Sequence, residues 1–474
     1  MHDFVAQHTT GLLLGAGVLL LLFAWWIAGR ASRPVKYIVR IALLLLIAAP
    51  VVLMTLGDYL PERVGQAPAT APPAAAPEQR EAPADAPPPS GMARRAPAPA
   101  TEPAPVTRAP PSPGGGGASP VQPRSADAQT DWDVVPVFYG TDRARADTPK
   151  RIAYGSDRAH RLELGRALVT IPKVHQVPNI ERPWVITIPY LQITVFQQEE
   201  DPKLHFTVQE MHALSREEFL DLVRQRLARS NAFKDQAVVF IHGYNNEFDY
   251  ALYRTAQMAY DLKFDGAPFL YSWPSGGGVA SYGYDRDSSV QAEPYLREFL
   301  DLVVRETGAK SVSIVAHSMG NLPLLQVLRD LAPSMPPGVK LNQIILAAPD
   351  VDRDVFQNLA RNLTAIGQGV TLYASANDRA MSAARRVAGG IPRAGDVPPD
   401  GPVIMSGIDT IDVTQTSTDV LALNHSTYAE NSALLNDIGL LLQTGERPPE
   451  RRLPLLERVT IERGSYWRYP GTKP

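Results

Sequence analysis

A serine between an apolar run and a helix-like segment is the feature of the sequence best suited to chemistry. The segment SIVAHSMGN (residues 313–321) places Ser318 between the small residues Ala316 and Gly320. A strand, an x-Ser-x-Gly turn and a helix present a serine hydroxyl as a nucleophile, and the helix N-terminus favours a developing negative charge. The alternative is an ordinary strand-to-helix turn in which the serine only caps the helix.

A serine nucleophile needs a base and a carboxylate that orients the base. His425, in the polar segment LNHSTY, is the only one of the nine histidines that follows Ser318, which is the chain order expected with this turn. Asp378, at the end of the run VTLYASAND, is the preferred carboxylate. Asp350, at the end of the run NQIILAAPD, is the alternative acid, although its surroundings also favour a helix cap before VFQNLARNL.

The negative oxygen that forms during such a reaction needs two backbone N–H donors. One is predicted at Met319, directly after the serine, and the other at Tyr244, in the loop after the run QAVVFIHG. Gly243 lets that loop approach closely. We interpret His242 as a residue that shapes the loop and His317 as a packing or site-lining residue.

No metal or cofactor is predicted. The chain has no cysteine, and its histidines form no cluster with carboxylates at ligand spacing. The segment SGGG (residues 275–278) lacks the Lys-Ser/Thr pair of a phosphate-binding loop and is interpreted as a mobile loop near the site.

Alternating apolar runs and helical segments must position these residues. Strands are predicted at 236–243, 268–274, 311–317, 342–350 and 370–378, with helices at 250–262, 290–307 and 321–332 between them. A helix with a Ser215/Glu218 capping box precedes them, after strand-like runs at 133–141, 166–172 and 184–196. Near-continuous apolar strands indicate a parallel sheet covered by helices on both faces, whose ligand site lies beyond the carboxyl ends of the strands.

Two apolar runs near the N-terminus predict a transmembrane hairpin in residues 1–60, with helices at about 11–29 and 37–57. The short connection carries Arg30, Arg33, Lys36 and Arg40, whereas the segment before the first run has no Lys or Arg. Positive residues favour the cytoplasmic side, so both ends of the hairpin are expected outside the cytoplasm. In a bacterial source, which the short anchor suggests, this is an inner-membrane protein with its later residues in the periplasm.

A linker follows the hairpin at residues 61–131. Of the 44 prolines, 18 lie between residues 61 and 123, together with many alanines and a run of four glycines. Such a segment buries too little apolar surface to offset its ordering entropy, so it is predicted to be disordered. The folded domain is expected at 132–474. The net charge of −3 gives no basic excess for nucleic acid.

The segments VVFIHGYNN, SIVAHSMGN, LYASAND and NHSTY resemble the α/β-hydrolase superfamily, and more narrowly its uncharacterised bacterial esterase/lipase-like branch. VFYGTDR, GRALVTIP, SWPS, YGYDRDS and AAPDVD extend the similarity over about 135–435. The resemblance implies the α/β-hydrolase fold and the Ser318, Asp378 and His425 roles, without a known substrate.

The sequence therefore predicts a membrane-anchored serine hydrolase, with a carboxylesterase or lipase as the preferred type, acting on a small-molecule or lipid ester. Two alternatives stay open: an acyltransferase that uses the same triad, and an inactive, tethered binding module. Five aromatic residues near the strand ends are candidates for an acyl pocket: Tyr244, Tyr271, Trp273, Tyr282 and Tyr284. For Tyr271 and Trp273, a role in the core is the alternative. The oligomeric state is not predicted.

Overall fold

The structure is a computed structural model that describes residues 130–149, 151–188, 193–278, 281–334, 341–376, 391–416 and 431–470. The predicted hairpin and nearly all of the predicted linker lie outside the described residues, as do Asp378 and His425. Within the described part of the chain, no helix is both long enough and apolar enough to cross a membrane.

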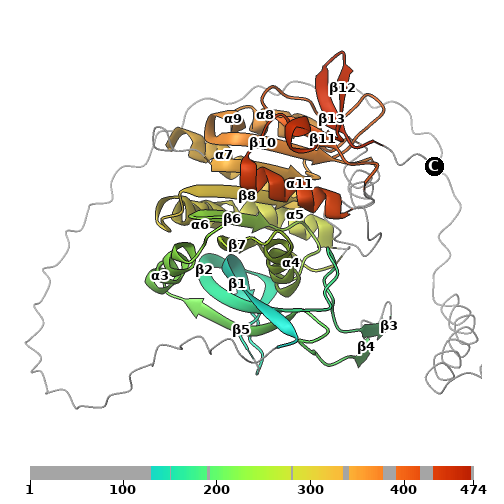
Figure 1. Cartoon of the computed structure of the whole chain (residues 1–474). Helices are drawn as coiled ribbons and strands as arrows, with labels where there is room; N and C mark the ends of the chain where they lie inside the picture. The colour runs from blue at the N-terminus through green and yellow to red at the C-terminus, as the bar shows by residue number, and fades with distance from the viewer. Residues whose placement is uncertain are drawn as a thin grey trace, which may run out of the picture. The chain divides into compact units, whose positions relative to one another are not determined.

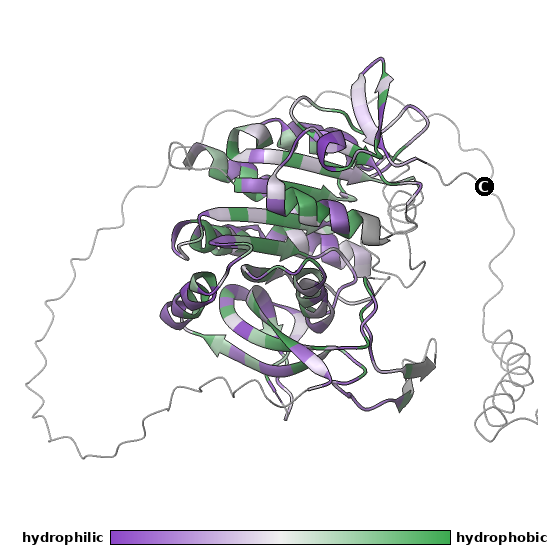
Figure 2. Cartoon of the chain, viewed as in Figure 1, coloured by the Kyte–Doolittle hydropathy of each residue, from purple (hydrophilic) through white to green (hydrophobic). Residues whose placement is uncertain are grey.

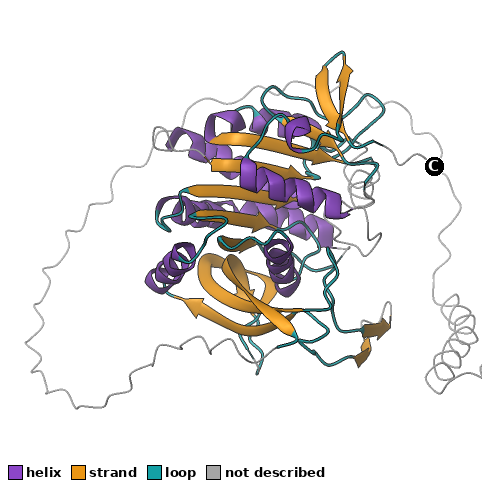
Figure 3. Ribbon diagram, in the orientation of Figure 1, coloured by secondary structure: helices purple, strands orange, loops and turns teal. Residues whose placement is uncertain are grey.

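One large sheet organises the described residues (Figures 1 and 3). Its strands are β1 (Trp132–Arg145), β2 (Tyr154–Pro172), β5 (Thr207–Leu214), β6 (Gln236–Ile241), β7 (Ala267–Ser272), β8 (Ser311–His317), β9 (Leu341–Ala347), β10 (Gly367–Ala374), β11 (Asp409–Asp412), β12 (Glu457–Ile461) and β13 (Gly464–Arg468). They lie in the order β12-β13-β11-β10-β9-β8-β6-β7-β1-β2-β5. The pairs from β1 through β7, β6, β8, β9, β10 and β11 to β13 are parallel, and β2, β5 and β12 add antiparallel edges.

Helices cover both faces of this sheet, as the sequence predicts. Their bounds are α3 (Arg216–Ala228), α4 (Phe248–Asp261), α5 (Tyr282–Gln291), α6 (Glu293–Arg305), α7 (Asn321–Leu331), α8 (Arg353–Ala360), α9 (Leu363–Ile366), α11 (Asn431–Thr444) and α12 (Pro449–Arg452). One apolar cluster joins the sheet to α3, α6, α7, α8 and α9, and another joins the opposite face to α4 and α11. The hydropathy colouring shows the same layering, with apolar strands at the centre (Figure 2).

The strands that carry the candidate site are buried on both faces, which explains their near-continuous apolar sequences. In β8, Ile314 and Ala316 face one cluster and Val315 faces the other. This alternation is the two-residue period of a strand. Full burial of an aliphatic side chain of this kind contributes about 1.5–3 kcal/mol to the free energy of unfolding. The turn at the end of β8 is therefore attached to a strongly stabilised strand.

Local sequence signals explain where two of the predicted helices begin. Ser215 and Glu218 form the expected capping box, in which each side chain accepts from the other residue's backbone N–H. Pro294 occupies the first turn of α6, where its missing N–H costs nothing. The predicted helix at 290–307 corresponds to α6, and Ala292 separates it from α5, a further helix that the sequence analysis did not predict.

The run at 184–196 was predicted to be strand-like, but it does not form one continuous strand. It forms a separate antiparallel pair, β3 (Val185–Ile188) and β4 (Ile193–Gln197), which hydrogen-bonds to itself and not to the large sheet. The pair belongs to a long connection between the adjacent strands β2 and β5. We call residues 173–206 the β2–β5 insertion.

A buried histidine holds the start of this insertion against α4. His175 Nδ1 lies 2.8 Å from Glu181 Oε2, and its Nε2 lies 3.0 Å from Asp261 Oδ1. Burial lowers the pKa of His175, but the bonds to Asp261 and Glu181 outweigh that effect and raise the pKa to about 9. The imidazole is therefore a cation between two carboxylates at neutral pH.

The contribution of His175 to stability should depend on pH. Because its folded pKa exceeds the value of about 6.5 expected in the unfolded chain, the stabilisation is complete below pH 6.5 and is lost as the pH rises through 9. The wild type should therefore be more stable than His175→Gln at pH 6, and this advantage should largely disappear at pH 9.5. We expect the difference in unfolding free energy between the two proteins to fall by about 2–3 kcal/mol over that range. Denaturant titrations across this range measure the difference.

His212→Gln is the matched control, since the His212 side chain is 59% exposed and its nearest carboxylate lies 3.7 Å away. Its unfolding free energy should run parallel to that of the wild type. Parallel curves for His175→Gln as well would mean that His175 carries no extra charge in the fold.

Candidate functional site

Ser318 lies in a strained turn at the carboxyl end of β8. The strand ends at His317, residues Ser318–Gly320 form a short 3-10 turn, and α7 begins at Asn321. Ser318 has a φ of 50°, in the left-handed region that L side chains rarely adopt. Strain of this kind persists only where the surroundings enforce it, and it is concentrated at functional sites.

Two glycines give the turn the space that it needs. A Cβ at Gly320 would lie 2.3 Å from the carbonyl oxygen of His242, so no side chain fits there. A Cβ at Gly243 would lie 2.8 Å from the Cβ of Ser318. The loop after β6 therefore passes directly against the serine, as the sequence predicts from Gly243.

Asn321 holds the turn through its side-chain amide, a role that the sequence analysis did not predict. Its side-chain Nδ2 donates to the carbonyl oxygens of Ser318 at 2.9 Å and Ala316 at 3.2 Å. The backbone N–H of Asp350 also donates to the Ser318 carbonyl, at 3.2 Å. The available signal was the position of Asn321, a polar residue at the start of the apolar helix α7.

The loop that carries Tyr244 is fixed by a buried carboxylate. Asp285 is fully buried in α5 and accepts from the backbone N–H of Asn245 at 2.9 Å. It also accepts from Ser275 Oγ and from the backbone N–H of Gly276. The SGGG segment is thus tied to the Tyr244 loop at its first two residues, which the sequence interpretation as a mobile loop did not anticipate.

A buried arginine connects three strand ends at the same edge. Arg143, near the end of β1, is 2% exposed and donates to Ser272 Oγ and to the carbonyl oxygens of Asn246 and Ser275. Burial lowers the pKa of Arg143 to about 10, so it stays charged at neutral pH. These contacts bring the ends of β1 and β7 against the Tyr244 loop.

The two histidines next to the site are neutral. His242 stacks on Trp273, and its Nδ1 donates to the carbonyl oxygen of Gly243 while its Nε2 accepts from Ser272 Oγ. Burial, and then Arg143, lowers the pKa of His242 well below its ordinary value. The interpretation of His242 as a residue that shapes the loop agrees with these contacts.

His317 is buried beside Ser318, and neither of its ring nitrogens has a hydrogen-bond partner within the described part of the chain. Burial lowers its pKa to about 3, with Arg254 adding to the effect. Neither His242 nor His317 has a hydrogen bond to Ser318 among the described contacts, which leaves His425 as the predicted base.

The interpretation of Asp350 as a helix cap is wrong. The cap of α8 is Asp352, whose Oδ1 accepts from the backbone N–H groups of Asp354 and Val355. Asp350 is instead buried, with Oδ1 3.0 Å from Arg393 Nε and Oδ2 accepting from the Tyr282 hydroxyl. Burial raises the pKa of Asp350, and Arg393 opposes that shift.

A small pocket borders the serine turn. It is lined by residues of α5, α7 and α8 and the turns beside them: Tyr282, Arg286, Met319, Leu322, Asp350, Val351, Asp352, Val355 and Arg393. Met319, one predicted oxyanion donor, and Tyr282, one candidate acyl-pocket aromatic, both line it. Tyr244, the other predicted donor, packs edge-on against Tyr282 with ring centroids 5.5 Å apart.

The other aromatic candidates do not line this pocket. Tyr271 and Trp273 are fully buried core residues, which was the alternative interpretation. Tyr284 is 39% exposed and donates to the carbonyl oxygen of Ser156.

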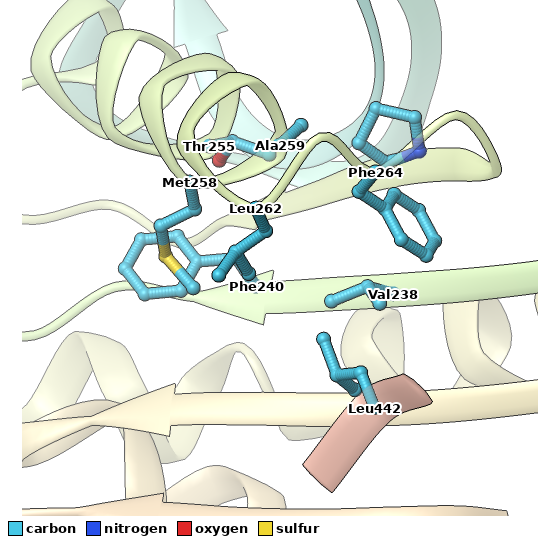
Figure 4. A pocket seen from close by; sticks show the side chains of 9 residues that line it. Val238, Phe240, Thr255, Met258, Ala259, Leu262, Phe264 and Leu442 are labelled. Carbon is cyan, nitrogen blue, oxygen red and sulfur yellow. The ribbon is translucent and has the colours of Figure 1, made fainter. Parts of the chain in front are cut away.

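A second hollow is apolar but unsuited to chemistry (Figure 4). It lies between β6, α4 and α11 and is lined by Val238, Phe240, Thr255, Met258, Ala259, Leu262, Phe264, Pro268 and Leu442. Among the described residues that line it, Thr255 carries the one side-chain hydroxyl, which donates to the carbonyl of Ala251. This lining supplies no activated nucleophile, unlike the carboxyl edge of the sheet. Among the described residues, no group of three or more His, Asp or Glu side chains could hold a metal ion.

The mostly parallel sheet, covered by helices on both faces, fits the architecture of an α/β hydrolase, and the strained serine follows a central strand as it does in that fold. Residues 216–443 match a family model described as alpha/beta hydrolase of unknown function (DUF900). This match, which runs from α3 to α11, supports the α/β-hydrolase superfamily and, for function, hydrolase chemistry. A comparison with curated proteins gave no match.

Proposed function

We propose that the protein is a membrane-anchored serine hydrolase that cleaves carboxylic esters. The observation that carries the proposal is the positive φ of Ser318 at the junction of β8 and α7, held by Asn321 and permitted by Gly320. The family match supports the hydrolase class, and the esterase or lipase type rests on the sequence resemblance.

In the proposed mechanism, Ser318 Oγ attacks the ester carbonyl while His425 takes its proton. Asp378 orients the imidazole and stabilises its charged form. The backbone N–H groups of Met319 and Tyr244 bind the oxyanion of the tetrahedral intermediate. His425 then gives the proton to the leaving alcohol. Water attacks the acyl-enzyme carbonyl while His425 takes its proton, and His425 returns that proton to Ser318 Oγ as the carboxylic acid leaves.

A fluorophosphonate probe tests this function on the full-length protein. We expect the probe to label Ser318 alone, as mapped by mass spectrometry of the peptides, and the label to be absent from Ser318→Ala. Ser313 is a buried serine within β8, and the Ser313→Ala control should label like the wild type. An unlabelled wild type, or persistent label in Ser318→Ala, would rule out the proposed nucleophile.

A panel of acyl esters then separates hydrolysis from acyl transfer. Release of free acid identifies a hydrolase, whereas preferential transfer to an added alcohol identifies the alternative acyltransferase. A probe-unreactive protein that still binds esters would support the inactive binding module.

The membrane topology gives an independent prediction. A reporter that is active only in the periplasm, fused after Pro61 in a bacterial host, should be active because the Arg30–Arg40 connection stays in the cytoplasm. A fusion after Ser32, within the connection, is the control and should be inactive. Activity of a cytoplasm-only reporter after Pro61 would invert the proposed topology.

A further inference from the structure

The β2–β5 insertion exposes an unusual share of the apolar side chains. The described residues include twelve large hydrophobic side chains that are exposed, and six of them lie within residues 173–206: Val174, Val177, Trp184, Val185, Phe196 and Leu204. Trp184 is 75% exposed and Phe196 is 53% exposed. Exposed apolar groups gathered in one segment mark an interaction surface, unlike scattered single residues. We call Trp184, Val185 and Phe196 the hairpin surface. Val185 pairs with Gln197 and therefore faces away from Phe196, so this surface includes both faces of the strand pair.

The hairpin surface stands on a strand pair that lacks support from the large sheet. The β3–β4 register pairs Ile186 with Phe196 and Val185 with Gln197, and among the described strands β3 and β4 form a two-stranded sheet of their own, apart from the large sheet (Figure 1). An isolated two-stranded pair is marginally stable in water. Contact with an apolar phase would both stabilise the pair and cover its side chains.

The base of the hairpin lies against the start of α4, which follows the loop that carries Tyr244. Arg182, two residues before Trp184, has its guanidinium 5.6 Å from the Tyr250 ring centroid and 3.9 Å from a carboxylate oxygen of Glu247. Glu247 directly precedes α4, whose preceding loop carries Tyr244. In Figure 3 the hairpin lies on the side to which β6 and β8 point, which is the side of Ser318.

The chemistry of the segment favours a lipid bilayer as the occupant. Residues 183–198 contain no Asp, Glu, Lys or Arg but include Trp184, Tyr190 and Phe196. Tryptophan and tyrosine are enriched at membrane interfaces. The predicted anchor would keep the domain near a membrane, because a linker of this length spans on the order of 50 Å as a coil.

A second copy of the chain is a weaker occupant. A stable protein interface covers about 800 Å² on each partner. Three side chains expose only part of that area, since a whole large aromatic residue buries about 150–250 Å².

Nucleic acid is also a poor occupant, because the residues that flank the segment form no basic patch. Arg182 precedes it, and three acidic residues follow it: Glu199, Glu200 and Asp201.

We propose that the hairpin surface inserts into the outer face of the membrane that anchors the chain and holds the carboxyl edge of the sheet against the lipid. The substrate of the Ser318 site is then an ester of a membrane lipid. The docking stands on the exposed residues and on the proposed anchor, whereas the substrate class rests also on the proposed hydrolase function. Leu322, Val351 and Val355 form the apolar part of the pocket beside Met319, and its other part carries the charged Arg286, Asp350, Asp352 and Arg393.

Depth-dependent fluorescence quenching tests the docking without any need for catalysis. The chain has no cysteine, so Gln197→Cys accepts a single environment-sensitive dye next to the hairpin surface. The full-length protein is reconstituted in phosphatidylcholine vesicles that contain a spin-labelled lipid. We expect strong quenching of the dye at 197 and little at Gln368→Cys, an exposed control at the amino end of β10.

Trp184→Ser with Phe196→Ser should abolish the quenching at 197. Equal, weak quenching at 197 and 368 would overturn the docking. A dye signal at 197 that changes with the protein-to-lipid ratio but not with the quencher would assign the surface to a second copy instead.

Activity measurements separate this inference from the proposed function. Trp184→Ser with Phe196→Ser should lower hydrolysis of a vesicle-embedded lipid ester by about tenfold or more and leave a short water-soluble ester unchanged. A wild type that cleaves neither ester refutes the hydrolase function, while the quenching still decides the docking. Equal loss on both esters would contradict a membrane role for the two residues.

Discussion

Replacing Ser318 by glycine should abolish turnover and at the same time stabilise the fold. The nucleophile is lost, which costs about 10⁴–10⁶ in turnover where a serine of this kind acts. The φ of 50° at Ser318 is unfavourable for a residue with a Cβ by about 1–2 kcal/mol, and glycine removes that strain. Since glycine also has more entropy to lose on folding, we expect a net gain of about 0.5–1 kcal/mol in the free energy of unfolding. Ester turnover and denaturant titration measure both effects.

Two matched variants isolate the cause. Ser318→Ala should lose the same activity without the gain in stability, because alanine retains the Cβ. Ser313→Gly makes the same chemical change within β8, where the backbone is extended, and should lower stability by about 0.5–1 kcal/mol. If Ser318→Gly destabilised the protein as Ser313→Gly does, no strain would be stored at the nucleophile position.

The central strands could be predicted from the sequence because burial on both faces leaves a near-continuous apolar signature. α5 could not, since the buried residues of this helix are Asp285, Ser288 and Ser289, and polar residues give no apolar periodicity. The short strands β11, β12 and β13 at the end of the sheet were also missed. In β12 and β13, only Tyr466 and Trp467 are buried, so the strand pattern is weak there.

The site shows the same division between local and distant signals. Spacing along the chain was enough to place Met319 beside Ser318, because strand, turn and helix are local features. Gly243 is distant in the sequence, and its place was predicted from the loop that follows a neighbouring strand of the expected fold. Arg143 and Asp285 were not found, because their partners lie up to 132 residues away along the chain and become neighbours only through the sheet order. In the segment PDVD, either acid could cap α8, and only the geometry assigns the cap to Asp352.

Asp378→Asn is expected to lower turnover by about three to four orders of magnitude while leaving the described fold intact. An amide in place of the carboxylate favours the wrong tautomer of His425 and does not stabilise its charged form. The contacts of Asp350 strengthen the preference for Asp378, since Arg393 and the Tyr282 hydroxyl already engage the two oxygens of Asp350.

Asp350→Asn is the matched comparison and should fail in a different way. It leaves the buried guanidinium of Arg393 without its carboxylate, and removing one partner of a buried ion pair costs about 3–5 kcal/mol, somewhat less where an amide retains a hydrogen bond. The backbone N–H that Asp350 donates to Ser318 survives the change, so the turnover of the folded fraction should stay near normal. Turnover per folded molecule and the thermal midpoint of both variants decide the assignment. An active Asp378→Asn beside a well-folded, inactive Asp350→Asn would transfer the orienting role to Asp350.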